Sequence, residues 1–276
     1  MTYRQLIDRL LVAGIDNATG EARLMVEHFT NQQPDAPLFD PDASINDPQS
    51  RLADAVHRRE NREPLQYILG TWYFWRQEYE VSPDCLVPRP DTEILVEQAL
   101  KALPRGGQFL DLCTGSGCIP ISMLCERPDA TATAVELSAP TLALAKRNAT
   151  RNGVSTERLT LLQGDVLAPE FLSSIGTFDL VVSNPPYIPT RELATLPPET
   201  RREPMLALDG GEDGLIFYRR MLQPDYRALC RNGANFLFEI GYDQGDALCA
   251  LAAEHGLSCR IIKDYGGNDR VAWVTE

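Results

Sequence analysis

The sequence predicts an α/β fold in which a mainly parallel sheet carries helices on both faces and follows a small all-helical domain. Three observations predict this. Apolar residues recur at helical spacing up to residue 65, β-forming residues dominate from 66 to 87, and strand-like and helix-like segments alternate from 88 onward. Strands separated by helix-length connections are typical of βαβ units. We therefore expect a helical bundle over 1–65, a β-hairpin linker over 66–87 and an α/β domain over 88–276.

Composition limits the class of protein before any motif is considered. The chain has 276 residues and a formal net charge of −13, which argues against a broad nucleic-acid-binding surface. Its seven cysteines form no C-x-x-C pair and it has three histidines, so we expect no bound metal and a reduced, cytoplasmic environment. No apolar run approaches the roughly 18 residues of a membrane-spanning helix, so we expect no membrane association.

The expected bundle begins with a helix that has Thr2 as its N-cap and Gly14 as its stop. A second helix covers 21–29, and the pair Asp47-Pro48 opens a third. The third helix carries four closely spaced arginines: Arg51, Arg58, Arg59 and Arg62. These arginines form either a solvated helix face or a docking surface.

The α/β domain is expected to begin with a helix over 92–103 that Asp91 caps, and Ser138 should cap a later helix. Two more helices are expected near 213–231 and 243–255. The expected strands are 109–113, 131–136, 159–165, 178–184, 234–240, 258–264 and 270–275. The alternation continues to the end of the chain without an internal repeat.

A glycine-rich turn, DLCTGSGCIP, follows the first expected strand of the sheet, where such folds bind nucleotide-like ligands. Gly115 and Gly117 allow the backbone to approach a ligand closely. Glu136 ends the second strand and can accept hydrogen bonds from two ribose hydroxyls. A dinucleotide-binding turn needs a third glycine where this chain has Pro120. The turn therefore favours S-adenosylmethionine, which has a ribose and no phosphate, over NAD; a glycine turn without a ligand is the alternative.

The stretch VVSNPPYIP ends the fourth expected strand at the same edge. Pro185 and Pro186 have a fixed φ and no N–H, so the chain leaves the sheet and its carbonyls point away from a neighbouring strand. The Asn184 side chain adds a carbonyl, and two such acceptors match the two hydrogens of one planar NH2 group. Because an amide nitrogen is a poor nucleophile, an enzyme must orient it. Tyr187 supplies an aromatic wall able to face a cationic sulfonium; a purely structural turn is the alternative.

These motifs resemble those of a known family. NPPY after the fourth strand, with DLCTGSG after the first, resembles methyltransferases that use S-adenosylmethionine to methylate amino or amide nitrogens. Five further stretches resemble the HemK/PrmC family, which methylates the glutamine of the Gly-Gly-Gln loop in peptide chain release factors: PLQYILG, LVPRPDTEILVEQAL, REPMLALDGGEDGLIFYR, FEIGYDQ and KDYGGNDRV. The resemblance implies a Rossmann-like class I methyltransferase sheet, release factors as protein partners, a substrate-recognising helical domain, and no direct nucleic-acid substrate.

The resemblance also implies roles for individual residues. The Asn184 side chain and the Pro185 carbonyl receive the glutamine amide, with Pro186 in the same turn and Tyr187 beside the amide. Asn184 and Tyr187 are the expected catalytic residues. The expected cofactor-binding residues are Asp111, Cys113, Thr114, Gly115, Ser116, Gly117, Glu136, Asp165, Val166 and Asn184.

Within the cofactor set, the resemblance implies that residues 113–117 wrap the methionine part, that Glu136 holds the ribose, and that Asp165 and Val166 flank the adenine. Two positions depart from the family pattern: Cys113 stands where many relatives have glycine, and Glu136 where aspartate is common. Neither departure removes a needed group. Since no motif supplies a histidine partner, we interpret Cys113 as a small packing residue.

Three other functions stay open. A sister enzyme that methylates a glutamine of a large-subunit ribosomal protein shares NPPY and CTGSGC, but PLQYILG, VPRPDTE and DGGEDGL favour the release-factor enzyme. A DNA or RNA amine methyltransferase is disfavoured by the acidic charge and the lack of a basic target-recognition domain. A non-catalytic module that keeps the fold is disfavoured by the intact NPPY motif and glycine turn.

Overall fold

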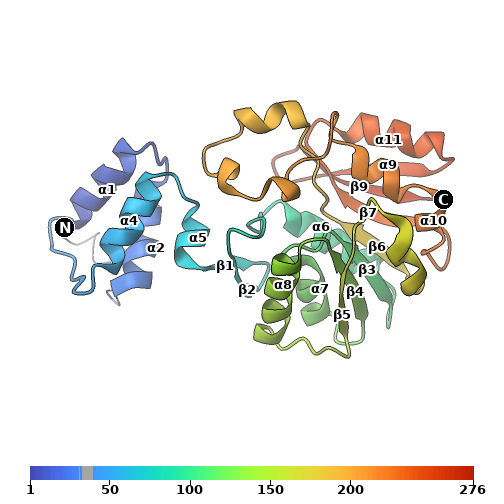
Figure 1. Ribbon diagram of the computed structural model, residues 1–276, viewed down its shortest axis with the longest axis horizontal. Coiled ribbons are helices and arrows are strands. Elements are labelled where there is room, and N and C mark those ends of the chain that lie inside the picture. The colour runs from blue at the N-terminus through green and yellow to red at the C-terminus, as the bar shows by residue number, and fades with distance from the viewer. Residues whose placement is uncertain (31, 33–39) are drawn as a thin grey trace. The chain divides into compact units, whose positions relative to one another are not determined.

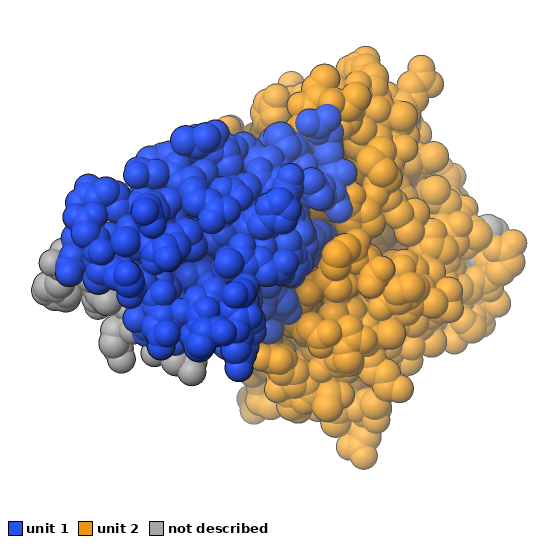
Figure 2. All heavy atoms as spheres, turned by 60° about the vertical axis from the view of Figure 1, so that its left-hand side comes forward, with its two compact units in different colours: residues 1–71, 197–202 blue, residues 72–196, 203–276 orange. Residues whose placement is uncertain are grey.

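The computed structural model describes residues 1–30, 32 and 40–276. The chain forms two compact units, which Figure 2 distinguishes by colour: Met1–Thr71 with Pro197–Arg202, and Trp72–Leu196 with Glu203–Glu276. The chain therefore crosses between the units three times. A six-residue segment from the second half of the sequence belongs to the N-terminal unit.

The N-terminal unit is built from helices, as the apolar spacing predicted. Its helices are α1 (Tyr3–Val12), α2 (Ala18–Thr30), α4 (Arg51–Glu60) and α5 (Leu65–Leu69). The predicted cap of α1 is confirmed, because the Thr2 hydroxyl accepts a hydrogen bond from the Gln5 amide and the Gln5 side chain accepts one from the Thr2 amide. One apolar cluster, which includes Leu6, Leu10 and Met25, forms the core of this unit.

Residues 66–69 differ from the prediction. The β-forming character of this stretch predicted a strand, but the structure has the helix α5, which ends at Gly70 with φ 76°. Leu65 and Ile68 lie three residues apart and join the helical core, so burial of one helical face outweighs local β propensity. The hairpin begins one residue later and consists of β1 (Thr71–Phe74) and β2 (Gln77–Glu80).

The larger unit contains a seven-stranded sheet, and the predicted α/β class is confirmed. Its strands are β3 (Gln108–Leu112), β4 (Thr131–Glu136), β5 (Leu159–Gln163), β6 (Leu180–Ser183), β7 (Asn235–Glu239), β8 (Ser258–Lys263) and β9 (Asp269–Thr275). The strand order is β5-β4-β3-β6-β7-β9-β8. All neighbours are parallel except β9, which runs antiparallel to both β7 and β8.

Helices cover both faces of this sheet (Figure 1). The α-helices are α6 (Thr92–Ala102), α7 (Cys118–Glu126), α8 (Ala139–Arg151), α9 (Ile216–Met221), α10 (Pro224–Arg227) and α11 (Gly245–Glu254). The 3-10 helices of this unit are η1 (Pro169–Ser174), η2 (Thr190–Thr195) and η4 (Met205–Ala207), whereas η3 (Thr200–Arg202) belongs to the N-terminal unit. Alternate strand residues enter opposite cores: Phe109 packs with α6 and α7, while Leu110 and Leu112 pack with α9 and α11.

Two predicted helix features are corrected and one is confirmed. The helix expected near 213–231 is interrupted between α9 and α10, because Pro224 cannot continue a hydrogen-bonded helix. Asp91 makes no capping hydrogen bond to α6; its carboxylate instead lies 3.2 Å from the Arg270 guanidinium. Ser138 caps α8 as expected, accepting from the Thr141 amide. None of the helices formed by the described residues combines the length and apolar character needed to cross a lipid bilayer.

Candidate active site

The loops that follow β3, β4 and β6 meet at one edge of the sheet. Leu112 of β3 pairs with Val135 on one side and with Ser183 on the other. The next residues are Cys113, Glu136 and Asn184, so this register brings the glycine turn, the carboxylate and the NPPY motif together. The strand order reverses here, between β3 and β6, which is where open α/β sheets bind ligands.

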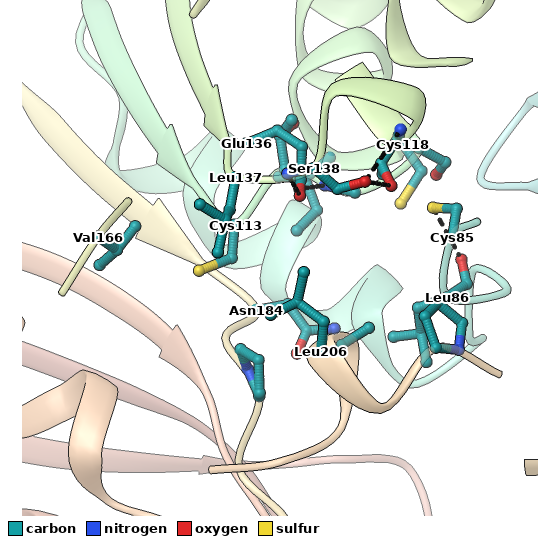
Figure 3. A pocket seen from close by; sticks show the side chains of 18 of the residues that line it. Cys85, Leu86, Cys113, Cys118, Glu136, Leu137, Ser138, Val166, Asn184 and Leu206 are labelled. Carbon is teal, nitrogen blue, oxygen red and sulfur yellow. Dashed lines mark hydrogen bonds between the residues drawn. The ribbon is translucent and has the colours of Figure 1, made fainter. Parts of the chain in front are cut away.

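A pocket opens at this edge, with Glu136 and Ser138 on one side and Asn184 and Leu206 on the other (Figure 3). The expected site residues that line it are Cys113, Thr114, Gly115, Ser116, Glu136, Asp165, Val166, Asn184 and Pro186. Four expected residues lie behind or beside the lining instead: Asp111, Gly117, Pro185 and Tyr187. The walls are mainly apolar, as in most small-molecule sites.

The glycine turn has the backbone conformation that its sequence requires. Gly117 has φ 80° at the start of α7, and a Cβ there would come within 2.9 Å of the Ile121 side chain. Cys113 has φ 60° although it is not a glycine, a conformation that costs an L-residue about 1–2 kcal/mol. A glycine at this position would adopt the same φ without this strain. We therefore interpret Cys113 as a packing residue held in the turn by its surroundings.

Glu136 braces the turn and keeps part of its bonding capacity free. One carboxylate oxygen accepts a hydrogen bond from the Gly115 amide at 3.0 Å, and the other accepts one from the Ser138 amide at 2.9 Å. The residue is 9% exposed and lines the pocket. A carboxylate has about four acceptor positions, so two stay available to hydroxyl groups of a ligand.

The side-chain amide of Asn184 is oriented by a hydroxyl from α6. The Asn184 Nδ2 atom donates to Thr92 Oγ1 at 3.2 Å. The Asn184 Oδ1 atom and the Pro185 carbonyl accept no hydrogen bond from the described residues. Tyr187 lies next to them, with its hydroxyl 3.5 Å from Glu239 Oε1. The motif therefore presents two unpaired acceptors from adjacent residues.

Comparison with known proteins decides the family. One family model, described as the PrmC N-terminal domain, matches residues 2–70, and another, the methyltransferase small domain, matches 90–196. A release factor glutamine methyltransferase from Caulobacter vibrioides is 42% identical over 271 residues, which cover 96% of this chain and 91% of the relative. The chain belongs to the release factor glutamine methyltransferase family. The predicted resemblance is confirmed.

Two further comparisons agree with this membership. A release factor glutamine methyltransferase from Agrobacterium fabrum is 39% identical to this family member and covers 95% of it, with 92% of the relative matched. The crystal structure of a methyltransferase from Pyrococcus furiosus is 20% identical, covers 71% of this chain and 87% of that chain, and has a TM-score of 0.53. This second likeness supports the methyltransferase fold alone.

Two residues that sequence reasoning missed contact the NPPY motif from distant parts of the chain. Gln244 donates from its side chain to the Tyr187 carbonyl at 2.9 Å. Gly214 has φ 78°, and a Cβ there would meet the same carbonyl at 2.3 Å. The stretches DGGEDGL and FEIGYDQ carried the resemblance without a physical reason, and these contacts supply one, since they fix the backbone of the motif.

Asp111 is a buried carboxyl group behind the glycine turn. It is fully buried, and neither oxygen has a hydrogen-bond partner among the described residues. Burial raises the pKa of Asp111 to about 8; the nearby Thr114 hydroxyl lowers it in part and Glu136 raises it further. Without a cation nearby, the folded chain therefore holds a proton on Asp111 near neutral pH.

The raised pKa of Asp111 predicts a fall in stability with rising pH. The folded state binds the Asp111 proton more tightly than the unfolded state does. The stabilisation due to this group is therefore complete below pH about 4 and is lost as pH rises through about 8. We expect the loss due to this group to reach roughly 2–5 kcal/mol. Chemical unfolding without cofactor at several pH values checks this, and Asp111→Asn should flatten the dependence. If the wild type and Asp111→Asn lost stability equally with rising pH, the raised pKa of Asp111 would be contradicted.

The described residues contain no group of three or more His, Cys, Asp or Glu side chains arranged to hold a metal ion. Three cysteines, Cys85, Cys113 and Cys118, line the pocket. Burial raises the pKa of each of these thiols. A protonated thiol is a weak nucleophile and metal ligand, so these side chains act as apolar wall.

Proposed function

We propose that this chain transfers a methyl group from S-adenosylmethionine to the side-chain amide nitrogen of the glutamine in the Gly-Gly-Gln motif of peptide chain release factors. The names of its relatives support this substrate over the ribosomal-protein alternative. The net charge of −13 supports a protein substrate over a nucleic acid. Residues 1–65 recognise the release factor, and the α/β domain carries the chemistry.

The observation that carries the proposal is the pair of unpaired acceptors in NPPY. The Asn184 amide donates to Thr92 and therefore turns its Oδ1 atom away from that hydroxyl. The Pro185 carbonyl follows immediately in the chain and has no partner among the described residues. A primary amide offers two hydrogens in one plane, so two neighbouring acceptors recognise it and reject groups that lack an NH2.

The pocket fits S-adenosylmethionine. Glu136 has two acceptor positions left for the ribose hydroxyls. Leu137 and Leu167, which are 42% and 36% exposed, offer apolar surface to the adenine beside Val166. Residues 113–117 would lie against the methionine part, and a cationic ligand there would favour the ionised form of Asp111 behind the turn. When bound, S-adenosylmethionine supplies an electrophilic methyl group.

The protein contributes orientation and polarisation to the reaction. The Asn184 Oδ1 atom and the Pro185 carbonyl each accept one hydrogen of the glutamine amide, which raises electron density on its nitrogen and aims the lone pair. The ring of Tyr187 closes one side of the site and favours a cation through its π face. No side-chain base is required, because the methylated amide nitrogen is strongly acidic and gives its proton to water.

Mass spectrometry of substrates after incubation with isotopically labelled S-adenosylmethionine tests this function. We expect one labelled methyl group on the glutamine of the Gly-Gly-Gln loop. Parallel reactions with ribosomal proteins, RNA and DNA serve as comparisons. Label on one of these and none on the release factor would overturn the proposed substrate.

Removing the carboxylate that holds the ribose should weaken cofactor binding. We expect Glu136→Ala to weaken S-adenosylmethionine binding by about 1–3 kcal/mol, because hydrogen bonds to a charged acceptor are lost and the Gly115 and Ser138 amides lose their partner. Calorimetry measures this, with Glu157→Ala as a control for an exposed carboxylate outside the pocket. Unchanged affinity in Glu136→Ala would remove Glu136 from the cofactor site.

A further inference from the structure

From the contacts around NPPY we infer that Thr92 and Glu239 are positioning residues, which fix the direction of the Asn184 side-chain amide and so make its Oδ1 atom an acceptor for the substrate. The inference rests on the proposed function and extends it to two residues far from the motif in sequence. Neither residue is proposed to touch the reacting atoms. Both act through Asn184.

An asparagine amide has almost the same shape in its two flipped orientations, so its hydrogen-bond partners decide which orientation is populated. The only hydrogen bond of the Asn184 side chain within the described residues is the one from Nδ2 to Thr92 Oγ1, at 3.2 Å. Thr92 is 2% exposed and lies at the first position of α6, where packing holds its hydroxyl in place. A hydroxyl can, however, either accept from an amide NH2 or donate to an amide oxygen.

Glu239 decides which role the Thr92 hydroxyl takes. It ends β7, which pairs with β6 so that Phe238 lies opposite Ser183, and the next residues are Glu239 and Asn184. Glu239 is 1% exposed, and its Oε2 atom has no hydrogen-bond partner among the described residues, so this buried oxygen lacks a donor. The Thr92 hydroxyl is a nearby donor, and it lowers the pKa of this carboxyl. An ionised carboxylate can only accept. It therefore takes the single hydrogen of the Thr92 hydroxyl, which leaves the hydroxyl oxygen to accept from Asn184.

The surroundings of Glu239 determine when this chain of hydrogen bonds has the correct direction. Burial raises the pKa of Glu239 to about 7; the Thr92 hydroxyl, the Arg270 charge and the Tyr187 hydroxyl lower it, and Asp91 raises it. From α9, the Tyr218 hydroxyl donates to the backbone carbonyl of Glu239 at 2.7 Å. These groups face the carboxyl from α6, β9, α9 and the NPPY loop. The hydrogen bonds through Thr92 to Asn184 therefore have the correct direction only when Glu239 is ionised, and this ionisation occurs near neutral pH.

Protonation of Glu239 reverses the direction of these hydrogen bonds. A protonated Glu239 donates to Thr92, the Thr92 hydroxyl then donates to Asn184, and the Asn184 amide turns its NH2 group toward the substrate. The substrate amide also presents hydrogens there, so the contact becomes repulsive. The side chains keep their positions, and only hydrogen positions and one amide flip change. The resulting arrangement is inactive.

Single-turnover methylation of the release factor by Thr92 variants is the first test. Thr92→Val keeps the shape and removes the hydroxyl, and we expect the rate to fall about 10- to 100-fold through misorientation, with little change in cofactor affinity. Thr92→Ser restores the hydroxyl and should restore most of the rate. Thr133→Val, on β4 outside the pocket, is the matched control. A full rate in Thr92→Val would overturn the inference.

The pH dependence of the same reaction tests Glu239. The wild-type rate should fall about tenfold per pH unit on the acid side, with a midpoint at or below about 7 because a cationic cofactor lowers the pKa of Glu239. Glu239→Gln, which can donate or accept, should be slower and should lose this acid limb. Glu126→Gln should keep it. An acid limb that persists unchanged in Glu239→Gln would overturn the role of Glu239.

Infrared titration separates this inference from the proposed function. The carboxyl band of Glu239, assigned by its loss in Glu239→Gln, should titrate at a pH roughly one unit higher in Thr92→Val, because the hydroxyl that stabilises the ionised form is gone. An unchanged titration would overturn the Thr92–Glu239 contact whatever the substrate is. A wild-type enzyme that leaves the release factor unmethylated would overturn the proposed function while this titration still tests the contact.

Discussion

Asn184→Ala is expected to lower the single-turnover methylation rate by roughly two to three orders of magnitude, the usual loss for one preorganised polar group. The substitution removes the acceptor that the Thr92 hydroxyl orients, so one hydrogen of the substrate amide loses its partner. Cofactor affinity should change far less, since Glu136 and the glycine turn are proposed to hold most of that ligand. Rates measured beside cofactor affinities separate the two effects.

Asn184→Asp sharpens this experiment. The aspartate keeps an acceptor and the shape, but it cannot donate to Thr92 and adds a negative charge near Glu239. We expect a rate between those of the wild type and Asn184→Ala. An Asn184→Ala enzyme that methylates the glutamine at near wild-type speed would refute the positioning mechanism.

The sheet and the cofactor edge were predictable because their signals are local. Alternating apolar residues such as Phe109 and Leu110 enter opposite cores, and this two-residue period is visible in the sequence. The parallel order places consecutive strand ends at one edge, so the glycine turn, Glu136 and NPPY were expected to meet. The exact strand pairing, which sets Cys113 between Glu136 and Asn184, needed the structure.

The contacts that orient the site were not predictable, because they join residues far apart in sequence. Thr92 and Asn184 are separated by 92 positions, and Gln244 reaches Tyr187 across 57. A threonine at the start of a helix has an ordinary local role as a capping residue, so nothing in its neighbourhood indicates a contact with NPPY. Glu239 ends a strand in the same way as many structural carboxylates do. Only the three-dimensional arrangement distinguishes these residues from their neighbours.

Local reasoning also failed where tertiary contacts override it. Asp91 stands where a helix cap is expected, yet its carboxylate pairs with Arg270 of β9. The β-forming residues 66–69 form a helix because Leu65 and Ile68 complete the core of the helical unit. In both cases a distant partner changes the outcome that nearest neighbours favour.

Arg59 of α4 and Arg62, which follows that helix, have partners inside the N-terminal unit. Arg59 is 5% exposed and pairs with Glu21 at 2.6 Å and with Glu199 at 2.8 Å. Arg62 also pairs with Glu199, at 2.7 Å. Despite partial burial, these two guanidinium groups lower the pKa of Glu199 to about 2. The ion pairs hold Pro197–Arg202 within the helical unit, so these two arginines serve its structure and are not a free basic patch.

The second large effect is expected from substrate size. Because the helical segment is proposed to bind the release factor, a short peptide containing Gly-Gly-Gln lacks the remote contacts that orient the glutamine. We expect its kcat/KM to be roughly 100-fold or more below that of the intact factor, which corresponds to about 3 kcal/mol of lost transition-state stabilisation. Kinetics with both substrates and the full chain measure this ratio. Equal kcat/KM values would argue that the pocket alone recognises the substrate.

Removal of the helices locates the remote contacts. A chain that starts at Trp72 keeps every residue that lines the pocket, and calorimetry should show that it still binds the cofactor. It also loses Arg59 and Arg62, the partners of Glu199, so retained cofactor binding and retained peptide methylation are the controls for an intact site. We expect the truncated enzyme to methylate the intact factor no faster than the peptide, because its advantage came from the helices. A truncated enzyme that methylates the intact factor at the full rate would show that the helical segment is not the recognition element.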